Sequence, residues 1–282
     1  MEAFGHDGQV FAALLYILAF VAGFAAFCRG AGRRNRNVKS SRRAAVFMLA
    51  AFVFQTAGLV AEGMYSHRCP LASMADVLAI VSWSLVVIYG IVGAAYRMSV
   101  LGLFTSALAA AFSSASASIG AGRVFPAAQT TVLVHAWLSL FSYGAFGIMA
   151  LVSSMYLIQL YGLKKRKLAP FFDVLPSLRE LDRVNFRLLV ASMTVFTLAL
   201  AAGVWRYAFS GGDVSESKLL LAVAVWLGYA AALLLRVRGV LHGRKLAYAL
   251  VGLFLLALAV LVPVGAGHSR IAEVPQAREA VR

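Results

Sequence analysis

The chain has 282 residues, of which 62% are hydrophobic and only 13% are charged. A soluble domain carries about 25% charged residues, so a water-soluble fold would leave a mostly apolar surface. The formal charge of +15 comes from basic residues between apolar runs, whereas a nucleic-acid interface would interleave basic with aromatic residues on one face. We therefore expect an integral membrane protein whose partner is the lipid bilayer, and no nucleic acid.

Eight apolar runs are long enough to cross a bilayer, since a spanning helix needs roughly 20 apolar residues. In chain order, the predicted spans are residues 10–28, 44–61, 76–96, 100–118, 132–161, 188–208, 219–235 and 246–265. The start of the chain lacks the features of a cleaved secretory signal, so the first run is expected to remain as a span. No polar stretch could form a soluble domain, and we expect one all-α transmembrane domain over residues 1–282.

The connections between these spans alternate in charge. Those after the first, third, fifth and seventh spans hold most of the basic residues: Arg29, Arg33, Arg34, Arg36, Lys39, Arg42 and Arg43, then Arg97, then Lys164, Lys165, Arg166 and Lys167, and finally Arg236, Arg238, Arg244 and Lys245. Basic loops stay in the cytoplasm. The pattern predicts both termini outside, in a multi-pass protein of the bacterial inner membrane.

The connection before the sixth span has a helical pattern of its own. Ser177 and Glu180 fit a capping box, in which each side chain satisfies a free amide at a helix start. Apolar residues then recur at helical spacing up to Arg187. We expect a short amphipathic helix on the inner membrane surface, from Leu178 to Arg187.

The two cysteines cannot pair with each other. Cys28 ends the first span on the inner side, whereas Cys69 lies in the outer loop before the third span, and a disulfide requires Cα atoms less than about 7 Å apart. No metal-ligand spacing of cysteines occurs. Cys69 is interpreted as a buried bystander, with pairing to another protein as the alternative.

Two histidines lie near the same predicted surface. His135 is about one turn inside the outer end of the fifth span, where ionisable groups are costly and often functional. His268 follows the eighth span after the stretch Gly265-Ala266-Gly267. Two neutral imidazoles at matching height could ligate one metal ion, or one haem iron axially. The alternative is that His135 contacts a neighbouring helix and His268 is solvated.

Several short strings, in a fixed order, resemble a known family. They are residues 68–73 followed by Trp83, residues 134–146 (VHAWLSLFSYGAF), residues 175–183 (LPSLRELDR), residues 243–248 (GRKLAY) and residues 267–269 (GHS). Together, from about residue 64 to 270, the chain resembles the cytochrome c assembly family of membrane proteins, which includes CcsA, CcmC and the HemX-like proteins. Its closest likeness is to the HemX-like branch.

The resemblance implies a haem site. In haem-handling members two external histidines hold the iron, which implies that His135 and His268 are the axial ligands of haem b, with Trp137 and Trp205 beside the porphyrin. Those members also have a tryptophan-rich outer loop ending in Asp-Pro-Lys. Here only Trp205 and the string Glu-Ser-Lys at 216–218 resemble it, and the pair of intramembrane histidines of larger members is missing.

The resemblance also implies a function without a stand-alone enzymatic reaction. We expect a haem-handling protein of cytochrome c biogenesis, with haem and another assembly protein or an apocytochrome c as partners. The alternative is a non-catalytic regulator or scaffold for a cytoplasmic tetrapyrrole-synthesis enzyme, acting through the basic loops and residues 178–187. A small-molecule transporter is the third hypothesis, but no inverted repeat or pair of broken helices supports it.

Overall fold

The computed structural model describes residues 2–30, 38–65, 73–96, 99–119, 130–164, 175–210 and 216–271. Within these ranges the chain forms only helices: α1 (Glu2–Gly30), α2 (Val38–Tyr65), α3 (Met74–Tyr96), α4 (Ser99–Ile119), α5 (Thr130–Lys164), α6 (Leu178–Ser210), α7 (Glu216–Val237) and α8 (Gly243–Ile271). Each helix contains a stretch long and apolar enough to cross a membrane. The predicted all-α fold with eight spanning helices is confirmed.

One predicted boundary is wrong. The expected separate surface helix from Leu178 to Arg187 is the first part of α6, which continues without a break. Its residues Leu181 and Val184 are buried on the same face as Leu188, so no change of direction is needed to keep that face in the core. Helix α8 continues to Ile271, beyond the span predicted for residues 246–265, and the limits of the membrane spans stay a prediction.

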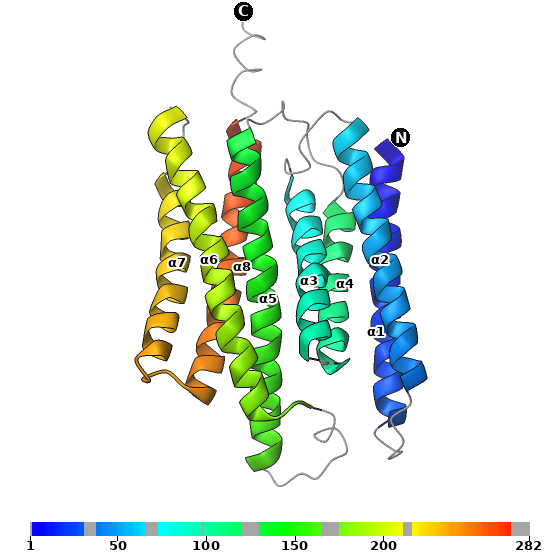
Figure 1. Cartoon of the computed structure of the whole chain (residues 1–282). Helices are drawn as coiled ribbons and strands as arrows, with labels where there is room; N and C mark the ends of the chain where they lie inside the picture. Colours follow the sequence, from blue (N-terminus) through cyan, green and yellow to red (C-terminus); the bar gives the residue numbers. More distant parts are fainter. Residues whose placement is uncertain are drawn as a thin grey trace, which may run out of the picture.

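The helices pack as an antiparallel bundle with α5 near its middle (Figure 1). Helix α5 packs on α6, α8 and α3, and α7 packs on α6 and α8. On the other side α1 packs on α2 and α4, and α3 packs on α4. The first turn of α1 and the last turn of α8 lie at the same end of the bundle.

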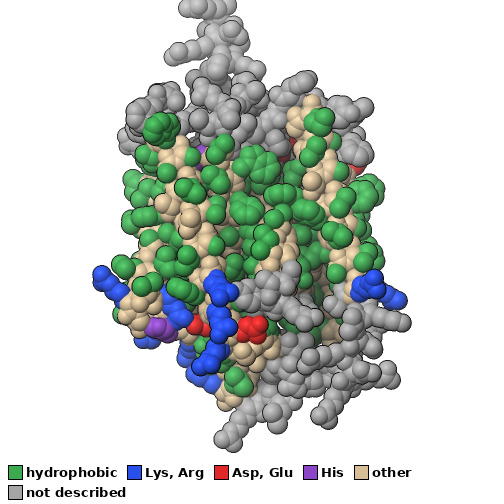
Figure 2. All heavy atoms as spheres, in the orientation of Figure 1, with side chains coloured by type: hydrophobic (Ala, Val, Ile, Leu, Met, Phe, Trp, Pro, Cys, Tyr) green, Lys and Arg blue, Asp and Glu red, His purple; other side chains and the backbone are tan. Residues whose placement is uncertain are grey.

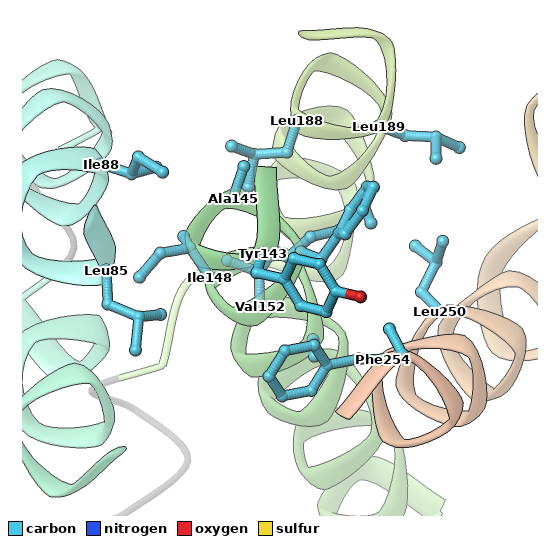
Figure 3. Close-up of a cluster of buried hydrophobic side chains, with 14 of the residues drawn as sticks. Leu85, Ile88, Tyr143, Ala145, Ile148, Val152, Leu188, Leu189, Leu250 and Phe254 are labelled. Atoms are coloured by element: carbon cyan, nitrogen blue, oxygen red, sulfur yellow. The ribbon is translucent and has the colours of Figure 1, made fainter. Parts of the chain in front are cut away.

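The apolar core has two parts. The larger cluster is formed mainly by α3 and α5–α8, with a few residues of α2 and α4, and the smaller one is formed by α1, α2 and α4 with Val86 of α3. Figure 3 shows α5 between Leu85 and Ile88 of α3 on one side and Leu250 and Phe254 of α8 on the other. In the same cluster the ring of Phe146 stacks on Tyr229 of α7, with centroids 3.9 Å apart. Helix α5 therefore links α3 to α7 and α8 within the larger cluster.

Glycines allow α5 to approach its neighbours closely. A Cβ added to Gly144 would lie 2.1 Å from the Ser84 Oγ of α3. One added to Gly147 would lie 2.6 Å from Leu85 Cδ2 and 3.4 Å from the Phe254 ring of α8. Small residues at such crossings are typical of membrane helices, whose association depends on close packing. These contacts fix the position of α5 along the bundle axis relative to α3 and α8.

A buried polar contact joins α1 and α2 to α3. The Tyr16 hydroxyl of α1 donates to Gln55 Oε1 of α2 at 2.8 Å. The Gln55 amide nitrogen donates in turn to the Ala79 carbonyl of α3 at 3.1 Å. Tyr16 and Gln55 are fully buried, and unmade hydrogen bonds would be costly there. Gln55 thus sets how the first two helices meet the third.

Basic side chains gather at one end of the bundle, below a face of hydrophobic side chains (Figure 2). We call this the basic end. Its exposed basic residues are Arg42, Arg43, Lys164, Arg179, Arg183, Arg187, Arg238, Arg244 and Lys245. Helices α1, α3, α5 and α7 end at this end of the bundle, as the charge pattern predicts. That the basic end faces the cytoplasm stays a prediction.

Candidate site around His135

His135 lies near the start of α5, at the end of the bundle opposite the basic end. Its half-buried imidazole turns toward α6, where Nδ1 is 2.6 Å from the Ala199 carbonyl oxygen. A carbonyl can only accept a hydrogen bond, so Nδ1 carries the hydrogen. In the neutral ring the lone pair is then on Nε2. The contact with α6 therefore fixes both the orientation of the ring and its tautomer.

Gly203 provides the space for this imidazole. It follows Ala199 by one helical turn, so both residues lie on the face of α6 that meets α5. A Cβ added to Gly203 would lie 2.8 Å from His135 Cε1 and 2.9 Å from Nδ1. Any larger residue would displace the ring from its position against the backbone of α6.

Trp137 is on another side of α5. Its ring meets the edge of Trp83 on α3, with centroids 6.1 Å apart and planes at 79°. Trp83 in turn stacks on Phe52 of α2 and donates to the Thr56 hydroxyl at 2.9 Å. Residues two apart on a helix point in nearly opposite directions. The structure therefore does not bring Trp137 together with His135, and its predicted contact with a porphyrin stays a prediction.

Trp205 is near the end of α6, with 63% of its surface exposed. It follows Gly203 by two residues, so it lies on a different side of α6 from the face that meets His135. It is at the same end of the bundle as His135, but it does not line the contact between α5 and α6. The side chains of residues 206–218, which include the Glu-Ser-Lys string, lie outside the described part of the chain.

His268 lies within α8 rather than beyond it, and its side chain is outside the described part of the structure. The close contact of Gly147 on α5 with Phe254 on α8 marks a common level along the bundle axis. The positions of His135 and His268 along that axis can both be measured from this level. At 1.5 Å per residue, His135 is about 18 Å from the level of that contact and His268 is about 21 Å from it, in the same direction. The two backbone positions are therefore at nearly the same height.

Other predicted site features are placed as follows. In the described ranges no group of three or more histidine, cysteine or acidic residues could hold a metal ion. Cys28 is an exposed free thiol at the basic end of α1. Cys69 lies outside the described residues.

Two capping contacts fix helix starts. The predicted cap of α6 is present, since the Glu180 amide donates to Ser177 Oγ at 3.3 Å. A second cap at the start of α3 was not predicted. There the Ser73 amide donates to Asp76 Oδ2 at 2.8 Å, and the Asp76 amide donates to Ser73 Oγ at 3.1 Å. The Ser-x-x-Asp spacing before an apolar run was the available signal.

Comparisons with known proteins agree on one family. The family model described as cytochrome C assembly protein matches residues 71–263. The protein called HemX of Brevibacillus brevis is 26% identical over 208 residues, which cover 72% of this chain and 76% of the relative. HemX of Bacillus subtilis (strain 168) is 24% identical over 217 residues, covering 74% of this chain and 79% of the relative.

A third relative matches a shorter part of the chain. The inner membrane protein YpjD of Escherichia coli (strain K12) is 28% identical over 146 residues, covering half of this chain and 52% of the relative. The matched family segment begins just before α3 and ends in α8. It therefore includes His135 and the face of α6 that holds it, but neither α1 nor α2.

Proposed function

The chain belongs to the cytochrome c assembly protein family, and on that basis we propose that it binds haem at the end of the bundle opposite the basic end. The observation that carries this proposal is the hydrogen bond from His135 Nδ1 to the Ala199 carbonyl. Histidines that bind metals commonly donate their second ring nitrogen to a carbonyl, which fixes the ring and makes it more basic. His135 has this arrangement through its contact with Ala199.

His268 is the proposed second ligand. It continues α8 seven residues after the buried Leu261, so its backbone position follows the face of the helix that packs in the core. Its height along the bundle is close to that of His135. The imidazoles of His135 and His268 would hold the iron of haem b, which would supply redox chemistry at this site.

The tryptophans would contribute in different ways. The exposed Trp205 would cover part of the porphyrin edge at this end of the bundle. Trp137 would act indirectly, because its contact with Trp83 fixes α5 against α3. The chain contains no CxxCH motif of its own, so any covalent attachment of haem would occur on a partner apocytochrome c. By the positive-inside rule we propose a bacterial inner membrane protein with this end outside.

The test is the absorption spectrum of the purified protein. We expect a Soret band and split visible bands, and we expect the double variant His135→Ala/His268→Ala to lose them. His242→Ala is the matched control, since His242 is exposed in the turn between α7 and α8 at the basic end. An unchanged haem content in the double variant would disprove the proposal. A colourless wild-type preparation would favour the regulator or scaffold instead.

A further inference from the structure

An apolar groove of about 540 Å³ runs between α6 and α7 on the membrane-facing surface. Its lining is Val190, Met193, Thr194, Thr197, Leu198, Trp226, Ala230, Leu233, Leu234 and Val237. The groove is open on the side away from the bundle. It lies outside the histidine site, and the proposed haem function makes no use of it.

The groove has about the length of one membrane leaflet. One end is at Trp226, whose indole nitrogen donates to the Thr197 hydroxyl at 2.9 Å and so joins α7 to α6. From there to Val237 there are eleven residues, or about 16 Å along α7. Half the hydrocarbon thickness of a bilayer is about 15 Å. The groove therefore extends from the middle of the membrane to its surface at the basic end.

Basic residues surround the mouth of the groove at that surface. Arg183 and Arg187 are exposed, and they continue the line of Val190 and Thr194 along the same face of α6. Figure 2 shows basic side chains in a column over this part of α6. At the basic end the described parts of α6 and of α7 with its following turn hold five arginines and two carboxylates: Arg179, Arg183, Arg187, Arg236 and Arg238, with Glu180 and Asp182.

One carboxylate at the mouth is already paired. Arg236 of α7 forms an ion pair with Asp182 of α6, and its guanidinium lies over the ring of Phe186 at 5.8 Å. Arg183 and Arg187 add exposed positive charge on the face of α6 that continues the groove, and such charge attracts anions. A mouth of this kind below an apolar groove is suited to a molecule with an anionic head and a hydrocarbon tail.

We propose that the groove binds one acyl chain of an anionic phospholipid from the leaflet at the basic end, with its phosphate between Arg183 and Arg187. Basic pockets between membrane helices suit such headgroups. A partner helix fits less well, since it would need an apolar strip over the whole bilayer, roughly 20 residues long. The bond between Trp226 and Thr197 ends the groove half-way, where an acyl chain also ends.

The test is native mass spectrometry of the purified full chain with phosphatidylglycerol or phosphatidylcholine of identical acyl chains. We expect phosphatidylglycerol to be retained more strongly. Arg183→Gln/Arg187→Gln should weaken its retention by roughly 30-fold, because each arginine near an anionic headgroup contributes about fivefold. Arg42→Gln/Arg43→Gln on α2 removes the same charge at the same end, away from the groove, and should change little.

A second variant tests the groove itself. Ala230→Phe places a ring among the lining residues and should lower the retention of both lipids. Equal losses in the two arginine variants would overturn the proposal, since they would indicate general surface charge. So would full retention in Ala230→Phe. A change of oligomeric state in Ala230→Phe, without lipid loss, would show that a second copy occupies the groove.

Discussion

At the scale of single residues, the candidate site depends on Gly203 having no Cβ. His135 rests against Gly203, where a Cβ would lie 2.8 Å from its ring, and its Nδ1 reaches the Ala199 carbonyl. The imidazole is thus held by main-chain atoms of α6. Its orientation follows from how α5 and α6 pack, so a substitution on α6 can change the ligand without touching it.

We predict that Gly203→Ala lowers the haem content of the purified protein several-fold. The new methyl group would displace the imidazole and break its hydrogen bond to Ala199. Alanine is otherwise the better helix former by about 1 kcal/mol, so the helix itself is not weakened. The Soret absorbance per protein measures the effect. Gly252→Ala is the control, because a Cβ there meets nothing within 4 Å; equal haem loss in both variants would contradict the prediction.

At the scale of elements, the attachment of α7 is the notable feature. Helix α7 packs mainly on α6 and α8, and its Tyr229 also stacks on Phe146 of α5. At the basic end it is tied to α6 by the ion pair of Arg236 with Asp182, whose side chains are 14% and 28% exposed. Removing one member of a largely buried pair leaves an uncompensated charge, whereas replacing both removes that penalty.

We therefore predict that Asp182→Ala destabilises the protein by roughly 3 kcal/mol and loosens α7 first. Hydrogen exchange should show faster exchange of the α7 amides nearest the basic end. The double variant Asp182→Ala/Arg236→Met should recover most of the loss. Glu180→Ala, which removes a carboxylate two residues away, is the control. A double variant as unstable as Asp182→Ala would show that the pair is not the relevant contact.

Much of the element-scale structure is predictable from the sequence, and the site is predictable only in part. Eight helices follow from the length of the apolar runs, since the bilayer sets that length. The continuation of α6 through residues 178–187 was missed because its polar face resembled that of a surface helix. The position of His135 was predicted, but Ala199 and Gly203 were not. Their role depends on the rotation of α5 against α6, which a mostly apolar sequence does not specify.

At the scale of the whole molecule, the separation of charge gives an orientation. Exposed basic side chains are at the basic end (Figure 2), and His135 is at the other. Loops rich in lysine and arginine are retained in the cytoplasm. By that rule we propose that the haem ligands face the outside of the membrane, and that the groove between α6 and α7 opens to lipids of the inner leaflet.

We predict that a membrane-impermeant thiol reagent distinguishes the two ends in intact cells with a permeabilised outer layer. In a background without the native cysteines, Ser118→Cys, near the end of α4 opposite the basic end, should react. Arg238→Cys, in the turn after α7, should react only after the membrane is broken. Labelling of Arg238→Cys in intact cells would reverse the orientation. Reaction of both variants after lysis controls for the accessibility of the thiols.

Gln55 links the two leading helices to the part of the chain that matches the family model. Its amide joins α2 to Ala79 of α3, and the segment shared with the family begins at residue 71. The hydrogen bond therefore crosses the boundary between the shared part and the two helices that precede it. Together with the bond from Trp83 to Thr56, it holds the hairpin of α1 and α2 against the part of the chain that matches the family model.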